Sequence, residues 1–244
     1  MNTAEVQKEE IRSMLRSLDL AAGEDAVQKL FSFYEMLTER NRVMNLTAIT
    51  AFEDVVEKHY ADSLLITRVI SMNGISDVID IGTGAGFPGI PLKILFPQMR
   101  LTLLDSLQKR IGFLDDVIRE LKLTDVQTVH GRAEDIGKDP AFRAQYDLCV
   151  SRAVANLSVL SELCLPFVKT GGRFVSYKSA GAAEEIRAAE KAVSLLGGGQ
   201  LDIMQASLPR SGQERLFVCI RKISVTPGKY PRKAGTPARK PLGD

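Results

Sequence analysis

Residues 78–89 read V-I-D-I-G-T-G-A-G-F-P-G, so a short apolar run leads directly into four closely spaced glycines, Gly82, Gly84, Gly86 and Gly89. The apolar run is typical of a buried strand, and Pro88 suits the first turn of a helix, where its missing N–H costs nothing. Glycines at such a junction let a ligand approach the main chain and meet N–H groups at a helix start. The stretch predicts either a ligand-binding strand–turn–helix or a purely structural turn.

From Ser76 the sequence alternates between strand and helix patterns. Strands are expected over 77–81, 100–105, 126–130, 146–151, 172–178, 201–208 and 214–221, and helices over 88–96, 107–121, 156–166 and 182–195. This alternation predicts right-handed crossovers and a mostly parallel, doubly wound α/β sheet of seven strands. Only P-R-S-G-Q separates the last two strands, so we expect them to pair as an antiparallel hairpin at the sheet edge.

The sequence before the sheet is helical in pattern. Apolar residues follow the i, i+3, i+4, i+7 spacing at Ile11, Met14, Leu15 and Leu18, and a second stripe follows at Val27, Leu30, Phe31, Tyr34 and Leu37. A third helical pattern covers about Phe52 to Ile70. We therefore predict a helical cap over residues 1–72, a Rossmann-like domain over 73–222 and a tail over 223–244. The tail is rich in Pro, Gly and basic residues, and we expect it to lack regular structure.

Charge is distributed unevenly along the chain. From Arg221 to the end there are seven Lys/Arg and one acid, whereas the remaining chain holds 25 bases and 29 acids. A basic tail on a mildly acidic body indicates a polyanionic partner, with a disordered solubilising tail as the alternative. The N-terminus lacks the apolar core of a signal peptide, and no stretch approaches the ~20 apolar residues of a membrane span. We expect a cytoplasmic protein with no membrane contact and reduced cysteines.

Two carboxylates help to choose among a nicotinamide dinucleotide, a phosphate and S-adenosylmethionine. Asp80 lies two residues before Gly82, where it would repel a pyrophosphate but could hold the amino group of a methionine moiety, directly or through water. Asp105 ends the next strand and could accept hydrogen bonds from both ribose hydroxyls, which fits either nucleotide. Asp80 and the terminal hairpin favour S-adenosylmethionine. The two histidines, His59 and His130, lack the spacing of a metal site, so no metal is expected.

With these motifs in place, the chain resembles the bacterial small-subunit rRNA guanine-N7 methyltransferases, the RsmG or glucose-inhibited division protein B family. The resemblance covers nearly the whole length. Besides the glycine turn, which continues into G-I-P-L, it rests on N-L-T at 45–47, H-Y-A-D-S-L at 59–64, L-D-S-L-Q-K-R-I-G-F-L at 104–114, G-R-A-E at 131–134, V-S-R-A at 150–153 and K-Y-P-R-K-A-G-T-P at 229–237.

The resemblance implies a class I methyltransferase fold, S-adenosylmethionine as methyl donor, and a guanine in the 530 loop of 16S rRNA (guanine 527 of the rRNA) as acceptor. It implies a cofactor pocket lined by Gly82, Phe87, Asp105, Ser106, Ala133, Glu134 and Arg152. From the residues we add Asp80, Gly84 and Gly86 to this cofactor set. Ala133 and Glu134 could read the adenine edge, and Arg152 could bind the cofactor carboxylate, orient the guanine O6 or form a structural ion pair.

The predictions for binding of the methyl acceptor depend on the cap and on basic residues. Guanine N7 carries a free lone pair at neutral pH, so no general base is needed and no catalytic group is assigned. Candidates for positioning the substrate are Asn45, His59, Asp62 and Arg152. Candidates for RNA contact are Lys109, Arg110, Arg132, Lys178, Tyr230, Arg232 and Lys233, with solvated surface charge as the alternative for the bases near strand ends.

The expected partner is 16S rRNA within the small ribosomal subunit or its precursor, and the expected state is a monomer. Two alternatives remain at this point: a methyltransferase acting on another RNA or on a protein, and a ribosome assembly factor without catalysis. We also expect that removal of residues 222–244 weakens RNA binding and spares cofactor affinity.

Overall fold

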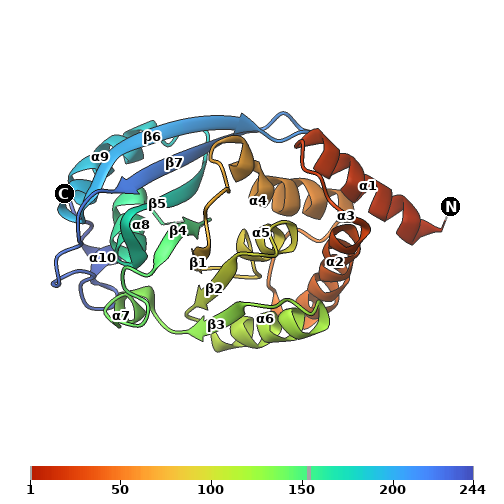
Figure 1. Cartoon of the computed structure of the whole chain (residues 1–244), viewed down its shortest axis with the longest axis horizontal. Coiled ribbons are helices and arrows are strands. Elements are labelled where there is room, and N and C mark those ends of the chain that lie inside the picture. Colours follow the sequence, from red (N-terminus) through yellow and green to blue (C-terminus); the bar gives the residue numbers. More distant parts are fainter. Residues whose placement is uncertain (1, 153–154, 244) are drawn as a thin grey trace.

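The computed structural model describes residues 2–152 and 155–243, and it is built on one seven-stranded sheet (Figure 1). The strands lie in the order β3-β2-β1-β4-β5-β7-β6. Their bounds are β1 Asp77–Ile81, β2 Arg100–Asp105, β3 Val126–His130, β4 Tyr146–Ser151, β5 Val168–Ser179, β6 Gly198–Ser207 and β7 Glu214–Lys222. Ala153, the last residue of the V-S-R-A motif, lies outside the described residues.

The first five strands are parallel, whereas β7 pairs antiparallel with both β5 and β6. The predicted sheet and its terminal hairpin are thereby confirmed, with β6 at the edge and β7 inserted beside β5. Because β2 and β4 flank β1 on opposite sides, the strand order reverses at β1. In doubly wound sheets ligands bind at the carboxyl ends of the strands beside such a reversal.

Helices cover both faces of the sheet (Figure 1). Their bounds are α5 Gly89–Leu95, α6 Gln108–Glu120, α7 Ala133–Ile136, α8 Leu157–Cys164, the 3₁₀ turn η3 Leu165–Phe167, and α9 Ala183–Leu195. The helices α5 and α6 pack against β2, whereas α8 packs against β4 and β5, and α9 against β6. The four predicted helices are confirmed, and the short α7 is an addition that the sequence patterns did not indicate.

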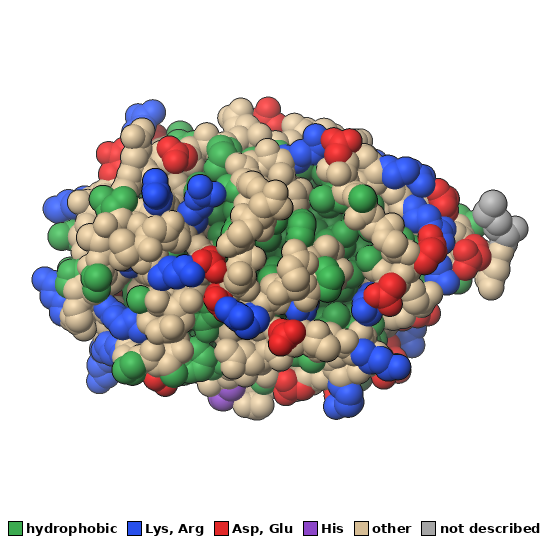
Figure 2. All heavy atoms as spheres, viewed as in Figure 1, with side chains coloured by type: hydrophobic (Ala, Val, Ile, Leu, Met, Phe, Trp, Pro, Cys, Tyr) green, Lys and Arg blue, Asp and Glu red, His purple; other side chains and the backbone are tan. Residues whose placement is uncertain are grey.

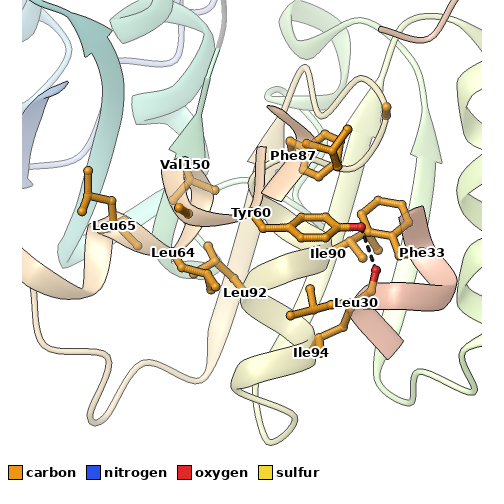
Figure 3. Packing of buried hydrophobic residues seen from close by; sticks show 14 of the residues in the cluster. Leu30, Phe33, Tyr60, Leu64, Leu65, Phe87, Ile90, Leu92, Ile94 and Val150 are labelled. Carbon is orange, nitrogen blue, oxygen red and sulfur yellow. Dashed lines mark hydrogen bonds between the residues drawn. The ribbon is translucent and has the colours of Figure 1, made fainter. Parts of the chain in front are cut away.

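The N-terminal helices pack onto the α5 and α6 side of the sheet. They are α1 Thr3–Ser17, α2 Glu24–Met44, α3 Phe52–Val55, the π-helical turn η1 Val56–Ala61, α4 Asp62–Leu64 and the 3₁₀ turn η2 Leu65–Arg68. Figure 3 shows Phe33 and Tyr60 from these helices packed beside Phe87 and Ile90 of the sheet domain. The Tyr60 hydroxyl also donates to the Leu30 carbonyl at 2.8 Å. The helical cap therefore shares one apolar core with the sheet, and its boundary at residue 72 stays a prediction.

A single helix was predicted over about Phe52 to Ile70, and the structure instead divides this stretch around a π-helical turn, Val56–Ala61. A π turn closes i→i+5 hydrogen bonds and so adds one residue to a helical turn. His59 lies within this turn, and Asp62 follows directly after it. Both side chains reach Arg152 at the end of β4, as described below.

The tail differs from its prediction. Residues Thr236–Arg239 form the short helix α10, and the side chains of Tyr230 and Pro231 are buried against the sheet domain. The expectation of a tail without regular structure is therefore wrong for the described residues. Composition favoured disorder, but long-range contacts with Arg143 and Glu162, described below, hold the segment in place.

Candidate active site

The glycine turn leaves β1 through two residues in the left-handed region. Gly82 has φ of 71° and Gly84 has φ of 62°, a conformation that L side chains adopt at a cost. A Cβ added at Gly82 would meet nothing within 4 Å. These two glycines thus give the turn its path and present bare backbone to open space.

The next two glycines serve close packing. At Gly86 an added Cβ would lie 2.7 Å from Cγ1 of Ile90, and at Gly89 it would lie 2.6 Å from Cδ2 of Leu103. Both distances are far below van der Waals contact. Gly86 therefore lets the turn lie close to α5, Gly89 lets the start of α5 lie against the sheet, and neither lines the cavity described next.

A cavity of about 540 Å³ opens where β1, β2, β3 and β4 end. Nine of the predicted cofactor and substrate residues line it, namely Gly82, Gly84, Phe87, Asp105, Ser106, Ala133, Glu134, Arg152 and His59. Two of the predicted RNA-contacting residues, Arg110 and Arg132, line it as well. Motifs far apart in the sequence thus converge on one site, and the volume lies within the range of small-molecule pockets.

Several lining residues were missed from the sequence. Leu46 and Thr47 come from the segment after α2, Val159 and Leu163 from α8, and Gly235 and Ala238 from the tail. Leu46 and Thr47 belong to the N-L-T motif, of which only Asn45 was predicted to position the substrate. Asn45 itself is exposed, is the C-cap of α2 with φ of 50°, and does not line the cavity.

Asp105 is held rigidly at the end of β2. Its Oδ2 accepts hydrogen bonds from the Gly84 N–H at 2.9 Å and from Arg110 Nη1 at 3.1 Å. Its Oδ1 accepts from the Leu107 N–H at 2.9 Å, and the residue is only 2% exposed. The carboxylate therefore ties the glycine turn to the next strand, and Arg110 already occupies one side of it.

Asp80 is fully buried beneath the turn and does not line the cavity. Its Oδ2 accepts from the Thr83 hydroxyl at 2.8 Å and from the Gly89 N–H at 2.9 Å. Burial raises the pKa of this carboxyl to about 6, against the lowering effect of these hydrogen bonds. The structure thus gives Asp80 the role of holding the turn against α5. Its Oδ1 has no partner among the described residues, and its contact with a cofactor amino group stays a prediction.

His59, Phe87 and Arg152 form a stacked group on one side of the cavity. The His59 and Phe87 rings are parallel within 18° with centroids 4.4 Å apart, and the Arg152 guanidinium lies 5.2 Å from the Phe87 centroid. Arg152 Nη2 donates to His59 Nδ1 at 3.2 Å, and Nε2 lies 2.9 Å from the Thr47 hydroxyl. Burial, followed by the charge of Arg152, lowers the pKa of His59 to about 3.

Asp62 holds the Arg152 side chain of this stacked group in place, although it does not itself line the cavity. Its Oδ2 accepts from Arg152 Nη1 at 2.8 Å, and its Oδ1 accepts from Arg215 Nε at 2.6 Å. Asp62 is 4% exposed, so the two arginines neutralise a buried carboxylate. Arg215, on β7, had not been singled out from the sequence. It links the edge hairpin to the π-helical turn and to Arg152.

Three of the predicted RNA-contacting residues are engaged inside the protein. Lys178 is 9% exposed and donates to the Ala155 carbonyl at 2.8 Å, and Tyr230 is 7% exposed. Arg232 pairs at 2.6 Å with Glu162, whose side chain is fully buried. This placement argues against RNA contact by the three side chains, because each is held by the fold. Exposed among the candidates are Lys109, Arg132 and Lys233.

The described residues contain no group of three His, Cys, Asp or Glu side chains that could hold a metal ion. Cys149, Cys164 and Cys219 are buried and free. None of the helices in the described ranges is long and apolar enough to cross a membrane.

The donor set of the cavity fits S-adenosylmethionine. Asp105 and Glu134 are carboxylates that accept from hydroxyl and amino groups, and Arg152 is a cation that suits a carboxylate. Gly82 and Gly84 leave the space that a polar chain needs against the backbone. The buried carboxylate of Asp80 beneath the turn disfavours a pyrophosphate at this position.

The fold and the cavity define a Rossmann-like, S-adenosylmethionine-dependent methyltransferase. A solved S-adenosylmethionine-dependent methyltransferase from Aquifex aeolicus has a similar fold, with a TM-score of 0.50 and 15% identity over 70% of this chain and 93% of that one. A family model described as GidB, rRNA small subunit methyltransferase G, matches residues 26–215. The chain belongs to this family.

Curated relatives agree over nearly the full length. A ribosomal RNA small subunit methyltransferase G from Alkaliphilus metalliredigens is 49% identical over 93% of this chain and 95% of its own length. The protein of that name from Clostridium novyi is 43% identical over 99% of this chain and all of its own. The resemblance inferred from the motifs is thereby confirmed.

Proposed function

We propose that this protein transfers a methyl group from S-adenosylmethionine to N7 of a guanine in the 530 loop of 16S rRNA. The observation that carries the proposal is the cavity at the strand ends, where the glycine turn, Asp105, Glu134 and the stack of His59, Phe87 and Arg152 meet. Family membership supplies the substrate class.

The cofactor is held by the chain's own groups at separate points. Gly82 and Gly84 give it backbone to lie against, and Asp105 accepts from its ribose hydroxyls. Ala133 and Glu134 face its adenine. When bound, S-adenosylmethionine supplies an electrophilic methyl group on a positively charged sulfur.

Arg152 takes the carboxylate of the cofactor. A guanidinium carries five N–H donors, and three of them are used by Lys58, His59 and Asp62 among the described residues. The Nε–H and one Nη2–H remain, and paired donors of this kind match a carboxylate. Pairing with O6 and N7 of guanine would instead block the atom that is to be methylated, so of the two ligand roles left open by the sequence we favour the carboxylate.

The acceptor site works by position and not by proton transfer. Arg152 can only donate, so the His59 Nδ1 that it contacts must carry the lone pair, and the Nε2–H then donates to Thr47. Both ring nitrogens are thereby occupied and the imidazole stays neutral, so His59 is no general base. Guanine N7 needs none, because its lone pair is free at neutral pH. The flat His59–Phe87 pair beside the cavity suits the orientation of a planar base.

We further propose that the protein acts in the cytoplasm, as a monomer, on the small ribosomal subunit or its precursor. The exposed bases Lys109, Arg132 and Lys233 contact RNA phosphates near the site. The functional units are the cap over 1–72, the methyltransferase domain over 73–222 and the basic tail over 223–244.

A methyl-transfer assay with tritiated cofactor tests the function. The purified protein is offered 30S particles, naked 16S rRNA and ribosomal proteins, and the labelled RNA is mapped by mass spectrometry. Label on a guanine N7 in the 530 loop is expected, and 16S rRNA from a deletion strain should lack the same mark. Label confined to a protein, or to another RNA, would overturn the proposal. Cofactor binding without any transfer would favour the assembly factor.

A further inference from the structure

The C-terminal tail forms part of the cavity wall. Gly235 and Ala238 line the cavity, and the Gly235 N–H donates to Glu134 Oε1 at 2.8 Å. The match to the family model ends at residue 215, before this part of the wall. The tail is therefore a feature of the site that the glycine turn and strand ends do not supply.

Glu134 is the residue on which the tail acts. It lies in the first turn of α7 and is 8% exposed, so its side chain has little freedom once one oxygen is held. Its Oε2 accepts no hydrogen bond from the described residues, and it is not among the fully buried atoms without a partner. One carboxylate oxygen is thus fixed by the tail, and the other stays available to a ligand in the cavity.

Arg143 ties the tail to the loop after α7. Its Nη1 donates to the Gly137 carbonyl at 2.7 Å and to the Tyr230 carbonyl at 2.9 Å, and its Nη2 donates to the Thr226 carbonyl at 2.8 Å. The Arg143 guanidinium thereby joins Gly137 to both ends of residues 226–230, the part of the tail that precedes Gly235. Such carbonyl contacts with a charged donor are strong and directional.

Glu162 is the second anchor, from α8. Its side chain is fully buried and accepts from the Arg232 backbone N–H at 2.7 Å and from Arg232 Nη2 at 2.6 Å. A buried carboxylate that lost these donors would be left unpaired, so the contact fixes Arg232 firmly. Gly235 follows three residues later, and its place beside Glu134 is set by this anchor and by Arg143.

We propose that the tail orients Glu134 for recognition of the 6-amino group of the adenine, with Arg143 and Glu162 as positioning residues. The inference rests on the proposed function, because it takes an adenosyl cofactor as the ligand. A carboxylate oxygen accepts from a 6-amino group but repels the 6-oxygen of hypoxanthine. Selectivity for adenine over hypoxanthine is therefore the property that the tail controls.

Calorimetry with two product analogues tests this assignment. The full chain is titrated with S-adenosylhomocysteine and with S-inosylhomocysteine, and the ratio of the two Kd values is compared between variants. The unaltered protein should prefer the adenosyl ligand by about ten-fold or more, the equivalent of one good hydrogen bond to a charged group. Glu134→Gln sets the benchmark for a lost acceptor.

Two variants disturb the tail at positions outside the cavity: Arg143→Met and Glu162→Gln. Each variant should reduce the adenosyl preference at least about three-fold while the Kd for the inosyl ligand changes little. The matched control is Arg187→Ala, an exposed arginine on α9, which should leave the ratio unchanged.

The outcomes separate this inference from the proposed function. An unaltered protein that binds neither ligand would overturn the function itself. Binding with an unchanged ratio in the folded tail variants would overturn only the role of the tail. Equal loss of affinity for both ligands would do the same, because it would make the tail a general support and not a positioning device for Glu134.

Discussion

At the scale of single residues, the protonation state of His59 follows from its neighbours. Arg152 offers only donors to Nδ1, and the ring is buried against Phe87, so a second proton has neither an acceptor nor solvent. The pKa of about 3 contrasts with 6.5 for an ordinary histidine. In the unfolded chain the imidazole binds a proton below pH 6.5, whereas in the folded chain it stays neutral.

Stability should therefore fall as the pH falls from 6.5 toward 3, because the unfolded state binds the proton that the native state refuses. The His59 contribution should cost about 2 kcal/mol between pH 6.5 and 4.5. His59→Asn retains an acceptor for Arg152 and does not titrate. The unfolding free energy of this variant should therefore decrease less on acidification than that of the unaltered protein. Urea unfolding at several pH values measures both proteins.

The comparison with His59→Asn is needed because the titration of Asp80 changes the stability in the opposite direction. Its pKa of about 6, raised by burial from 3.8, means that the native state binds a proton there before the unfolded state does. Asp80 therefore adds stability as the pH falls from 6 to 4. If the two proteins lost stability in parallel over pH 6.5–4.5, a neutral His59 in the native state would be contradicted.

Arg152 gives a second prediction at this scale. If the Nε–H and the second Nη2–H, which no described residue accepts, hold the cofactor carboxylate, Arg152→Met should weaken S-adenosylhomocysteine binding by about 100-fold, the loss of a paired charged contact. It should leave 5′-methylthioadenosine, which has no carboxylate, nearly unaffected. Calorimetry with the two ligands provides the ratio of their Kd values for each protein. Arg173→Met, at an exposed position on β5, is the control, and equal losses for both ligands would refute the assignment.

At the scale of elements, the strand–turn–helix unit divides its glycines between two tasks. Gly86→Ala places a Cβ at 2.7 Å from Ile90 and keeps φ of 98°, so it should cost about 3 kcal/mol of stability. Gly82→Ala meets no atom within 4 Å and carries only the strain of its φ, about 1 kcal/mol. It should instead lower cofactor affinity by about ten-fold, because the methyl group occupies the cavity side of the turn.

Thermal unfolding and calorimetry with S-adenosylhomocysteine distinguish the two glycines. Gly23→Ala serves as the control, since Gly23 has φ of −76° and free space around an added Cβ. A Gly82→Ala protein that was strongly destabilised and bound the ligand normally would reverse the roles that we assign.

Elements governed by local pattern could be predicted, and those governed by distant contacts could not. The apolar strands and the glycine turn carry their signal within a few residues, so their positions followed from the sequence. The π-helical turn Val56–Ala61 leaves the apolar periodicity almost unchanged, so it was missed. The order of the tail depends on Glu162, which lies 70 residues from Arg232. As the one charge in the apolar helix 157–164, Glu162 was the available signal.

At the scale of the whole molecule, the tail has two faces. Its inner face holds Tyr230 and Pro231 against the sheet domain, and its outer face carries the exposed bases Lys229, Lys233 and Lys240. Figure 2 shows Lys and Arg side chains gathered at the end of the molecule where Figure 1 places α10. The structure thereby changes one expectation: loss of residues 222–244 should weaken cofactor binding as well as RNA binding, because Gly235 and Ala238 leave with the tail.

Substitution of the outer bases alone should separate the two effects. Lys229, Lys233 and Lys240 changed together to Ala remove three charges but none of the tethers to Arg143 and Glu162, since Lys240 contributes only its carbonyl to Arg232. Binding to a 16S rRNA fragment with the 530 loop should weaken, and the slope of log K against log salt should flatten by about 2, or 0.7 for each lost phosphate contact. S-adenosylhomocysteine affinity should stay unchanged, in contrast to Arg143→Met. An unchanged salt slope would mean that the RNA does not reach the tail, and would confine its role to the cofactor.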